Sequence, residues 1–229
     1  MILAAIPLTL GVYWVALMLN RRFRLAVLNP VLVAMAVLIG FFLVFRSQLP
    51  AYQRGAQPLT WLLSPAVVAL ALPLYKQLPH VRRRAKAIAL STLAGSVCSI
   101  VVGTALALLA GGSRAMAASL APKAVTTPVA MAIASSTGGI PSVTAAAVIF
   151  AGILGASFGF AFLERMGVAH DESLGLAMGA ASHALGTAKA AETDETRGAF
   201  SSLALVICAV LTSVVAPIVV PLMLRSVGA

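Results

Sequence analysis

Residues 124–163 read AVTTPVAMAIASSTGGIPSVTAAAVIFAGILGASFGFAFL, a stretch of 40 residues without a charged side chain. A helix needs about 20 apolar residues to cross the hydrocarbon core of a bilayer, so this stretch is about twice as long as one span. The sequence SSTGGIPS at 135–142 carries the Gly and Pro residues that favour a turn. The stretch therefore predicts two membrane helices joined by a short break.

Similar apolar runs lie on both sides of this stretch. They cover residues 2–19, 25–45, 59–75, 87–113, 115–121, 173–188 and 198–224. In hydrocarbon every backbone polar group must be bonded within the protein, and helices achieve this segment by segment. The sequence therefore predicts an all-α, polytopic membrane helical bundle of about eight hydrophobic segments, some of them broken or re-entrant. We expect residues 1–229 to form a single integral membrane domain.

The composition is that of a protein dissolved in lipid. Apolar residues make up 61% of the 229 residues, charged residues make up 10%, and the mean hydropathy is +1.03. An ordinary soluble domain has roughly 25% charged residues, so the composition argues against a soluble enzyme, a disordered chain and a disulfide-stapled secreted domain. Cys98 and Cys208 both lie inside apolar runs and are interpreted as packing residues, not as a redox pair or a metal site.

The net charge of +10 comes from basic residues in the gaps between the apolar runs. Anionic lipid headgroups explain this placement better than nucleic acid does. The gaps at 20–24 and 76–86 are the most basic, so the positive-inside rule places both in the cytoplasm. We therefore expect a multi-pass protein of the bacterial cytoplasmic (inner) membrane with its N-terminus outside. The gaps after residues 163 and 188 have no clear basic bias, so the orientation of the second half stays open.

Three segments do not have the sequence of plain membrane helices. The run at 59–75 contains two prolines, residues 122–128 read PKAVTTP, and the short run at 173–188 is rich in glycine. Proline removes a backbone donor and glycine weakens a helix. Irregular backbone at membrane depth is tolerated only where protein or a water-filled cavity covers it. Interrupted segments of this kind are the best sequence indicator of a transporter site.

The acidic residues all lie outside the apolar runs, at positions 164, 171, 172, 192, 194 and 195. Many cation-coupled carriers hold their cation with an Asp or Glu at mid-membrane, so this distribution argues against a cation antiporter. It also gives no support to an intramembrane metal site or a catalytic pair of carboxylates. The sequence has no phosphate loop, metalloprotease helix or nucleophile elbow. We therefore expect neither enzyme activity nor a cofactor.

The polar side chains inside the runs are basic or hydroxylic. A lysine in hydrocarbon must reach the headgroups, pair or face water. A lysine, threonine hydroxyls and a helix N-terminus together suit a small carboxylate anion. The candidate substrate-binding residues are therefore Lys123, Thr126, Thr127, Ser182, His183 and Thr187, with Asn29 and Ser64, each beside a proline, as weaker candidates.

Each basic candidate has a purely structural alternative. Lys123 could extend to a lipid headgroup at the start of its segment. His183 could be a satisfied packing residue, whereas its functional role would be that of a ligand donor or proton relay. Lys189 lies near Glu192 and could be an ordinary interface lysine.

At these residues the sequence resembles the LrgB/CidB family of bacterial membrane proteins. The resemblance covers nearly the whole chain and is carried by LNP at 28–30, SPAVVALA at 64–71 with PLY at 73–75, PKAVTTP at 122–128, GIP at 139–141, SHALGTAKA at 182–190 and FSSLAL at 200–205. Lys189 stands where arginine is common in the relatives, which keeps the positive charge but loses the bidentate geometry.

The resemblance implies more than one function. The family was first described as antiholin-like regulators of murein hydrolase export. A plant plastid relative resembles a glycolate/glycerate carrier, and some bacterial relatives resemble pyruvate carriers that work with an LrgA-like partner.

From the residues and the resemblance we expect a carrier for small monocarboxylates of the glycolate, glycerate, pyruvate or lactate type. Broken helices would hold the anion, and alternating access would move it. The alternative is an antiholin-like regulator of murein hydrolase export and autolysis that acts with a small LrgA-like membrane partner. Small-residue helix faces also favour a homodimer, and nucleic acid is not an expected partner.

Overall fold

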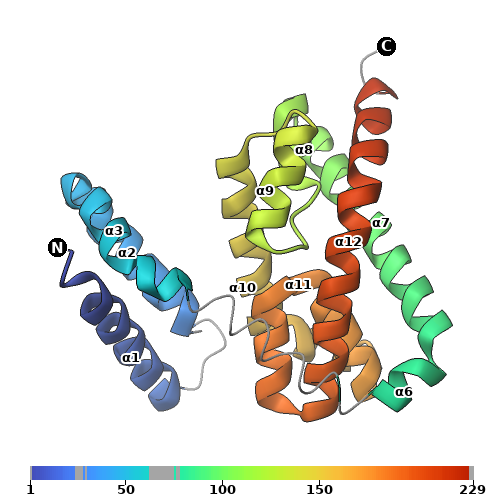
Figure 1. Ribbon diagram of the computed structural model, residues 1–229, viewed down its shortest axis with the longest axis horizontal. Helices are drawn as coiled ribbons and strands as arrows, with labels where there is room; N and C mark the ends of the chain where they lie inside the picture. Colours follow the sequence, from blue (N-terminus) through green and yellow to red (C-terminus); the bar gives the residue numbers. More distant parts are fainter. Residues whose placement is uncertain (1, 24–27, 29, 62–74, 76–77, 227–229) are drawn as a thin grey trace. The chain divides into compact units, whose positions relative to one another are not determined.

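The structure of the chain is a computed structural model, which describes residues 2–23, 28, 30–61, 75 and 78–226. All regular elements in these ranges are helices (Figure 1), which confirms the predicted all-α fold. The contacts group the chain into two compact units, Met1–Leu70 and Ala71–Ala229. The prediction of a single domain over residues 1–229 stays a prediction. The weaker candidates Asn29 and Ser64 lie outside the described residues.

The first unit consists of apolar helices that pack on the N-terminal helix. Its elements are α1 (Ala5–Phe23), α2 (Pro30–Val44), the short 3-10 helix η2 (Arg46–Gln48) and α3 (Leu49–Trp61). The chain bends by 109° between α2 and the helical stretch that follows it. Helix α1 contacts both α2 and α3, and the hydroxyl groups of Thr9 and Tyr52 lie 2.8 Å apart across the α1–α3 contact.

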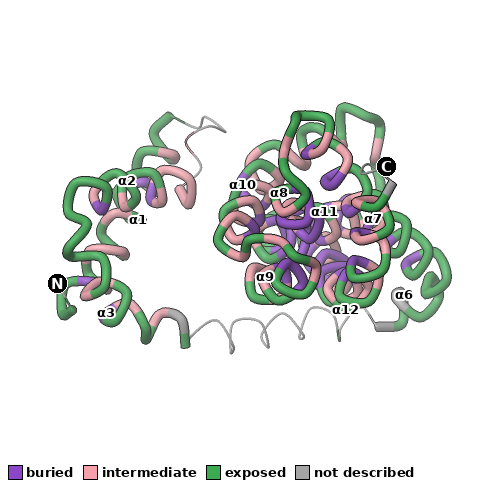
Figure 2. Tube along the Cα trace, turned by 90° about the horizontal axis from the view of Figure 1, so that it is seen from above, coloured by how far each residue is buried: buried purple, intermediate pink, exposed green. Residues whose placement is uncertain are grey.

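The second unit is a larger bundle around three long helices. Its elements are α6 (Leu78–Arg83), α7 (Ala85–Leu109), α8 (Arg114–Leu120), α9 (Thr127–Ser136), α10 (Pro141–Arg165), α11 (Asp171–Thr193) and α12 (Glu195–Ser226). Buried residues gather in the middle of this bundle (Figure 2), where α11 lies between α10 and α12. The predicted break in the 40-residue stretch is confirmed, because α9 ends at Ser136, Gly138 has a positive φ of 80°, and α10 begins at Pro141.

Helix α11 is broken, as predicted for this glycine-rich segment. His183 has φ 42° and ψ −136°, which no helix allows. A Cβ atom on Gly186 would lie 2.8 Å from the backbone oxygen of Met178, although a straight helix would hold these residues about two turns apart. The second limb of α11 therefore folds back beside the first. Figure 1 shows the two limbs, with α12 starting at the end where α11 began.

Glycine permits the close contact between α11 and α12. A Cβ atom on Gly175 or Gly179 would overlap the backbone of Arg197 or Ser201 on α12, so no larger residue fits at either position. At the same end of the bundle, Arg197 donates hydrogen bonds to Asp171 at 2.7 Å and to Glu164 at 3.2 Å, which joins α10, α11 and α12. The re-entrant limbs are thus fixed by both backbone packing and charge.

Fewer helices in the described residues can span a membrane than the eight hydrophobic segments predicted, and most of the predicted segment at 59–75 lies outside those residues. Within the described residues, three helices are long and apolar enough to cross a membrane, namely Ala85–Leu109, Pro141–Arg165 and Glu195–Arg225, and the bent pair Pro30–Val44 with Arg46–Leu59 would make a fourth. The apolar runs at 115–121 and 124–134 form the short helices α8 and α9, and the run at 173–188 forms the broken α11. An apolar run reports lipid-compatible composition, whereas a span also requires uninterrupted length.

Candidate anion-binding site

A cavity of about 660 Å³ lies in the second unit, between α7 and the first limb of α11. We call it the α7/α11 cavity. Ser91, Gly95 and Ser99 line it from α7, and Ala177 and Ala181 line it from α11. Its wall on the α11 side ends just before the break at His183, so the cavity stops at a point where the membrane helix is interrupted.

Lys123 lies at the second interruption of the bundle, in the segment between α8 and α9, and lines the same cavity. Its Nζ atom donates a hydrogen bond to the backbone oxygen of Ser99 at 3.1 Å. Gly103 makes room for the lysine, because a Cβ atom there would lie 2.7 Å from Nζ and 2.8 Å from the backbone oxygen of Leu120. Pro122 is fully buried and anchors the segment. The ammonium group is therefore held against α7 and is partly buried.

The other end of the cavity carries an ion pair. Arg84, which precedes α7, pairs with Glu172 in the first turn of α11, and both residues line the cavity. About 15 residues of α7 separate Arg84 from Ser99, which corresponds to about 22 Å along the helix axis. The α7/α11 cavity is thus long, with a neutralised charge pair at one end and an ammonium group at the other.

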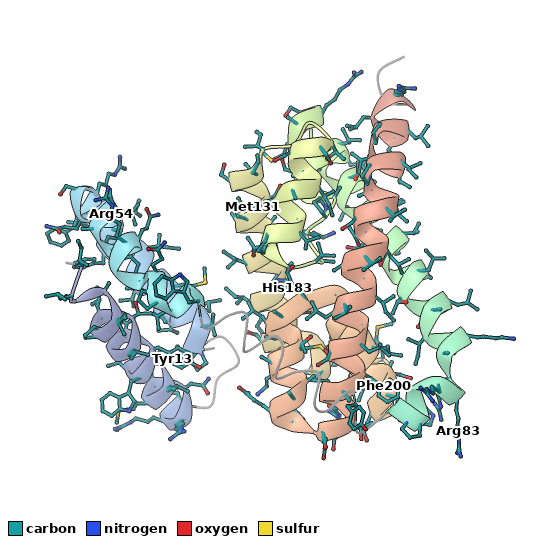
Figure 3. The ribbon with its side chains drawn as sticks, in the orientation of Figure 1. Tyr13, Arg54, Arg83, Met131, His183 and Phe200 are labelled. Atoms are coloured by element: carbon teal, nitrogen blue, oxygen red, sulfur yellow. The ribbon has the colours of Figure 1, made fainter. Side chains whose placement is uncertain are left out.

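The polar candidates at the break of α11 do not line this cavity. His183 is buried, and its Nε2 atom lies 2.7 Å from the backbone oxygen of Val148 on α10. Thr187 donates to the backbone oxygen of His183 at 2.8 Å, and the hydroxyl of Ser201 donates to Thr187 at 3.0 Å. These bonds join the break to α10 and α12. Figure 3 labels His183 at the turn of α11.

Ser182 and the two threonines of α9 also lie away from the cavity. Ser182 is buried against α10, where a Cβ atom on Gly155 would overlap its hydroxyl group. Thr126 is the N-cap of α9, but its side chain makes no capping hydrogen bond. Thr127 is the first residue of that helix. Of the six described candidates, Lys123 alone lines the cavity. Ser182, His183 and Thr187 instead hold the break of α11 against α10 and α12.

Lys189 is exposed, and its Nζ atom lies 3.4 Å from a carboxylate oxygen of Glu192. This contact is the one expected for an interface lysine. Among the described residues, no group of three or more His, Cys, Asp or Glu side chains could hold a metal ion.

The sequence did not single out the cavity-lining residues of α7, because the run at 87–113 has the composition of a plain membrane helix. A signal was nevertheless present in its periodicity. Ser91, Gly95, Cys98, Ser99 and Val102 follow one another at helical spacing and therefore share one face. A stripe of small and polar residues on an otherwise apolar helix indicates either close packing or a cavity, and here it lines the cavity. Arg84 and Glu172 could not be paired from sequence, because 88 residues separate them.

Long apolar helices and a broken apolar helix define this chain as a helical membrane protein. It belongs to the LrgB-like family, whose sequence profile matches residues 9–222. An uncharacterised protein of Haemophilus influenzae is 38% identical over 212 residues, which cover 93% of this chain and 92% of that protein. The uncharacterised protein YxaC of Bacillus subtilis is 38% identical over 94% of both chains.

The antiholin-like protein LrgB of Bacillus mycoides is a relative whose name indicates a function. It is 37% identical over 193 residues, which cover 84% of both chains. No solved structure matches the chain.

Proposed function

We propose that the chain acts as an antiholin-like membrane protein that regulates murein hydrolase export, together with a small LrgA-like membrane partner. The observation that carries this proposal is the 37% identity, over 84% of both chains, to the antiholin-like protein LrgB of Bacillus mycoides. Such a role requires a surface for assembly in the membrane. An apolar groove of about 350 Å³ on the first unit, formed by α1 and α2, offers a surface for a partner helix.

Gly11 lies in this groove, and nothing lies within 4 Å of a Cβ atom built on it. The substitution Gly11→Leu should therefore fill the groove without disturbing the fold. Gly40 on α2 is equally open and does not line the groove, so Gly40→Leu is a matched control. In a strain that lacks the gene, we expect the wild-type chain and the control to restore the normal rate of autolysis, and Gly11→Leu to fail. Unchanged autolysis in the deletion strain would refute the regulatory role.

We propose as a second function that the chain carries small monocarboxylates of the glycolate, glycerate, pyruvate or lactate type, which it moves without converting them. The observation that favours it is the position of Lys123. Within the described residues, the one hydrogen-bond acceptor for Nζ of Lys123 is the backbone oxygen of Ser99. Lys123 is partly buried, and an ammonium group in such a position without a counter-ion is costly, so an organic anion in the α7/α11 cavity would stabilise it.

Uptake of labelled pyruvate, lactate and glycolate into proteoliposomes tests the carrier function. We expect Lys123→Gln to reduce uptake by at least tenfold, because the substitution removes the charge that opposes the carboxylate. Lys86 is an exposed lysine outside the cavity, so Lys86→Gln should leave uptake unchanged. Equal uptake by Lys123→Gln and the wild-type chain would remove the proposed site.

A further inference from the structure

We infer that the α7/α11 cavity prefers monoanions that carry an apolar body of several carbon atoms over acids of two or three carbons. This inference rests on one part of the second proposed function, the binding of a carboxylate at Lys123. It shifts the preferred ligand from the small acids named there to longer amphipathic monocarboxylates such as medium-chain alkanoates.

The charges of the cavity favour a single negative charge on the ligand. Three charged side chains line it, and two of them, Arg84 and Glu172, already form an ion pair. Lys123 is the remaining charge and sits at the opposite end, bonded to a backbone oxygen. A ligand with one carboxylate at Lys123 therefore neutralises the remaining positive charge of the cavity. A dicarboxylate would bring a second negative charge to a site where no described side chain is left to balance it.

The wall of the cavity favours an apolar ligand body. Ser91 and Thr92 line it, but their hydroxyl groups donate to the backbone oxygen of Ile88 on their own helix, at 3.1 Å and 2.7 Å. Most of the other lining side chains are alanine or larger apolar residues, among them Val102, Leu176 and Phe200. Ser99 and Ser173 also line the cavity, so the wall offers a small acid only a few hydroxyl groups among mainly alkyl side chains. Each methylene group buried against it should strengthen binding about fourfold.

The size of the cavity points in the same direction. Its volume of about 660 Å³ is that of pockets which hold drug-sized ligands. Its length of about 22 Å along α7 exceeds the reach of a three-carbon acid several times. Water is a poor filler of the space beside the alkyl side chains, because it needs polar partners. An extended alkyl chain would fill the space that a small acid leaves empty.

Protection of Cys98 from alkylation measures occupancy of the cavity. Cys98 is exposed and lines the cavity, whereas Cys208 is buried, so labelling of the full-length chain reports on Cys98. The ligands are acetate, pyruvate, hexanoate and octanoate, with octylammonium and octanamide as amphiphiles of different charge. We expect protection to strengthen about fourfold per methylene group from acetate to octanoate, to be lost in Lys123→Gln, and to persist in Lys86→Gln. Octylammonium and octanamide should protect weakly.

Each other outcome overturns the inference in a distinguishable way. Equal protection by pyruvate and octanoate would leave the carrier function standing but reject the preference for an apolar body. Equal protection by octanoate and octanamide would show that Lys123 does not select the charge. No protection by any acid would reject both proposals.

Two control experiments complete the test. The first repeats the labelling in nanodiscs that contain phosphatidylglycerol. If this lipid protects Cys98 and octanoate then adds no protection, an anionic lipid is the occupant, and the preference for a free acid is overturned.

If Lys123→Gln does not fold, Gly95→Leu replaces it. Its Cβ atom would meet only Ala180, at 3.8 Å, while its remaining atoms reduce the cavity. We expect Gly95→Leu to weaken octanoate protection at least tenfold, and unchanged protection would count against the inference.

Discussion

Lys123 is the proposed anion-binding residue, and its position depends on a glycine of α7. Gly103 of α7 lies so close to Lys123 and to the backbone of Leu120 that no side chain fits between them. The sequence singled out Lys123 because a lysine inside an apolar run needs an explanation. It did not single out Gly103, because one glycine in a long apolar helix carries no distinguishing pattern.

Gly103→Ala should destabilise the fold and weaken ligand binding. The added Cβ atom would lie 2.8 Å from the backbone oxygen of Leu120, which cannot move without shifting the segment that holds Lys123. We expect a loss of about 1–3 kcal/mol in the free energy of unfolding, typical of overpacking. Gly95→Ala is the matched control on the same helix, since its Cβ atom would have only an ordinary contact at 3.8 Å. Equal stability of the two variants would contradict the tight contact at Gly103.

His183 combines a hydrogen bond through its ring with a backbone conformation that favours glycine. Its φ of 42° with ψ −136° is strained for any residue with a Cβ atom. We therefore expect His183→Gly to be more stable than His183→Ala by about 1–3 kcal/mol, because both variants lose the bond to Val148 but only glycine relieves the backbone. Thermal unfolding of the two purified variants measures this difference. A more stable alanine variant would show that the backbone at position 183 is unstrained.

The hydroxyl candidates show what residue patterns leave open. A threonine or serine in a membrane helix can face a ligand or bond to the backbone, and the sequence is the same in both cases. Here Thr187 bonds to the backbone oxygen of His183, and Ser182 packs against α10. Their choice depends on which helix lies opposite, which no local pattern specifies.

At the scale of elements, the broken helix α11 was the most predictable feature of the site. Its glycines and short apolar length are enough to predict an interruption from the sequence alone. The sequence did not indicate that the two limbs lie side by side, since a kinked but continuous helix would have the same composition. The fold-back depends on the contacts of Gly175 and Gly179 with α12, which are visible only once α12 is placed.

The ion pair of Arg84 and Glu172 links α7 to α11 at one end of the cavity. Arg84 is 60% exposed, so solvent screens the pair and its contribution to stability should be small. We expect Glu172→Gln to leave the melting temperature nearly unchanged but to speed the alkylation of Cys98, because the link across the end of the cavity is lost. Glu192→Gln breaks the exposed pair with Lys189 and is the matched control. Identical alkylation rates in both variants would show that the pair does not restrict access.

At the scale of the whole molecule, composition predicted the helical membrane protein, but it did not distinguish the hydrophobic segments that are long enough to span from those that are short or broken. Hydropathy measures whether a segment is apolar enough for lipid. The segments of α8 and α9 are apolar enough, but both helices are too short to span a membrane. The orientation rests on basic residues alone and is a proposal, in which the gap at 76–86 faces the cytoplasm of a bacterial inner membrane.

Cysteine labelling of intact cells tests this orientation. In a Cys98→Ala, Cys208→Ala background, a membrane-impermeant thiol reagent should label Lys86→Cys only after the inner membrane is permeabilised. The exposed position of residue 86 makes it accessible to the reagent on whichever side it lies. Labelling of intact cells would reverse the proposed orientation and place the Arg84–Glu172 end of the cavity outside.

The most direct test of the account is the location of a bound carboxylate. An experimental structure determined with 8-bromooctanoate would place the bromine by its anomalous scattering and the carboxylate by its density. We expect carboxylate oxygens within hydrogen-bonding distance of Nζ of Lys123, with the bromine between α7 and the first limb of α11. An empty cavity at saturating ligand, or a bromine bound only on the lipid-facing surface, would contradict it.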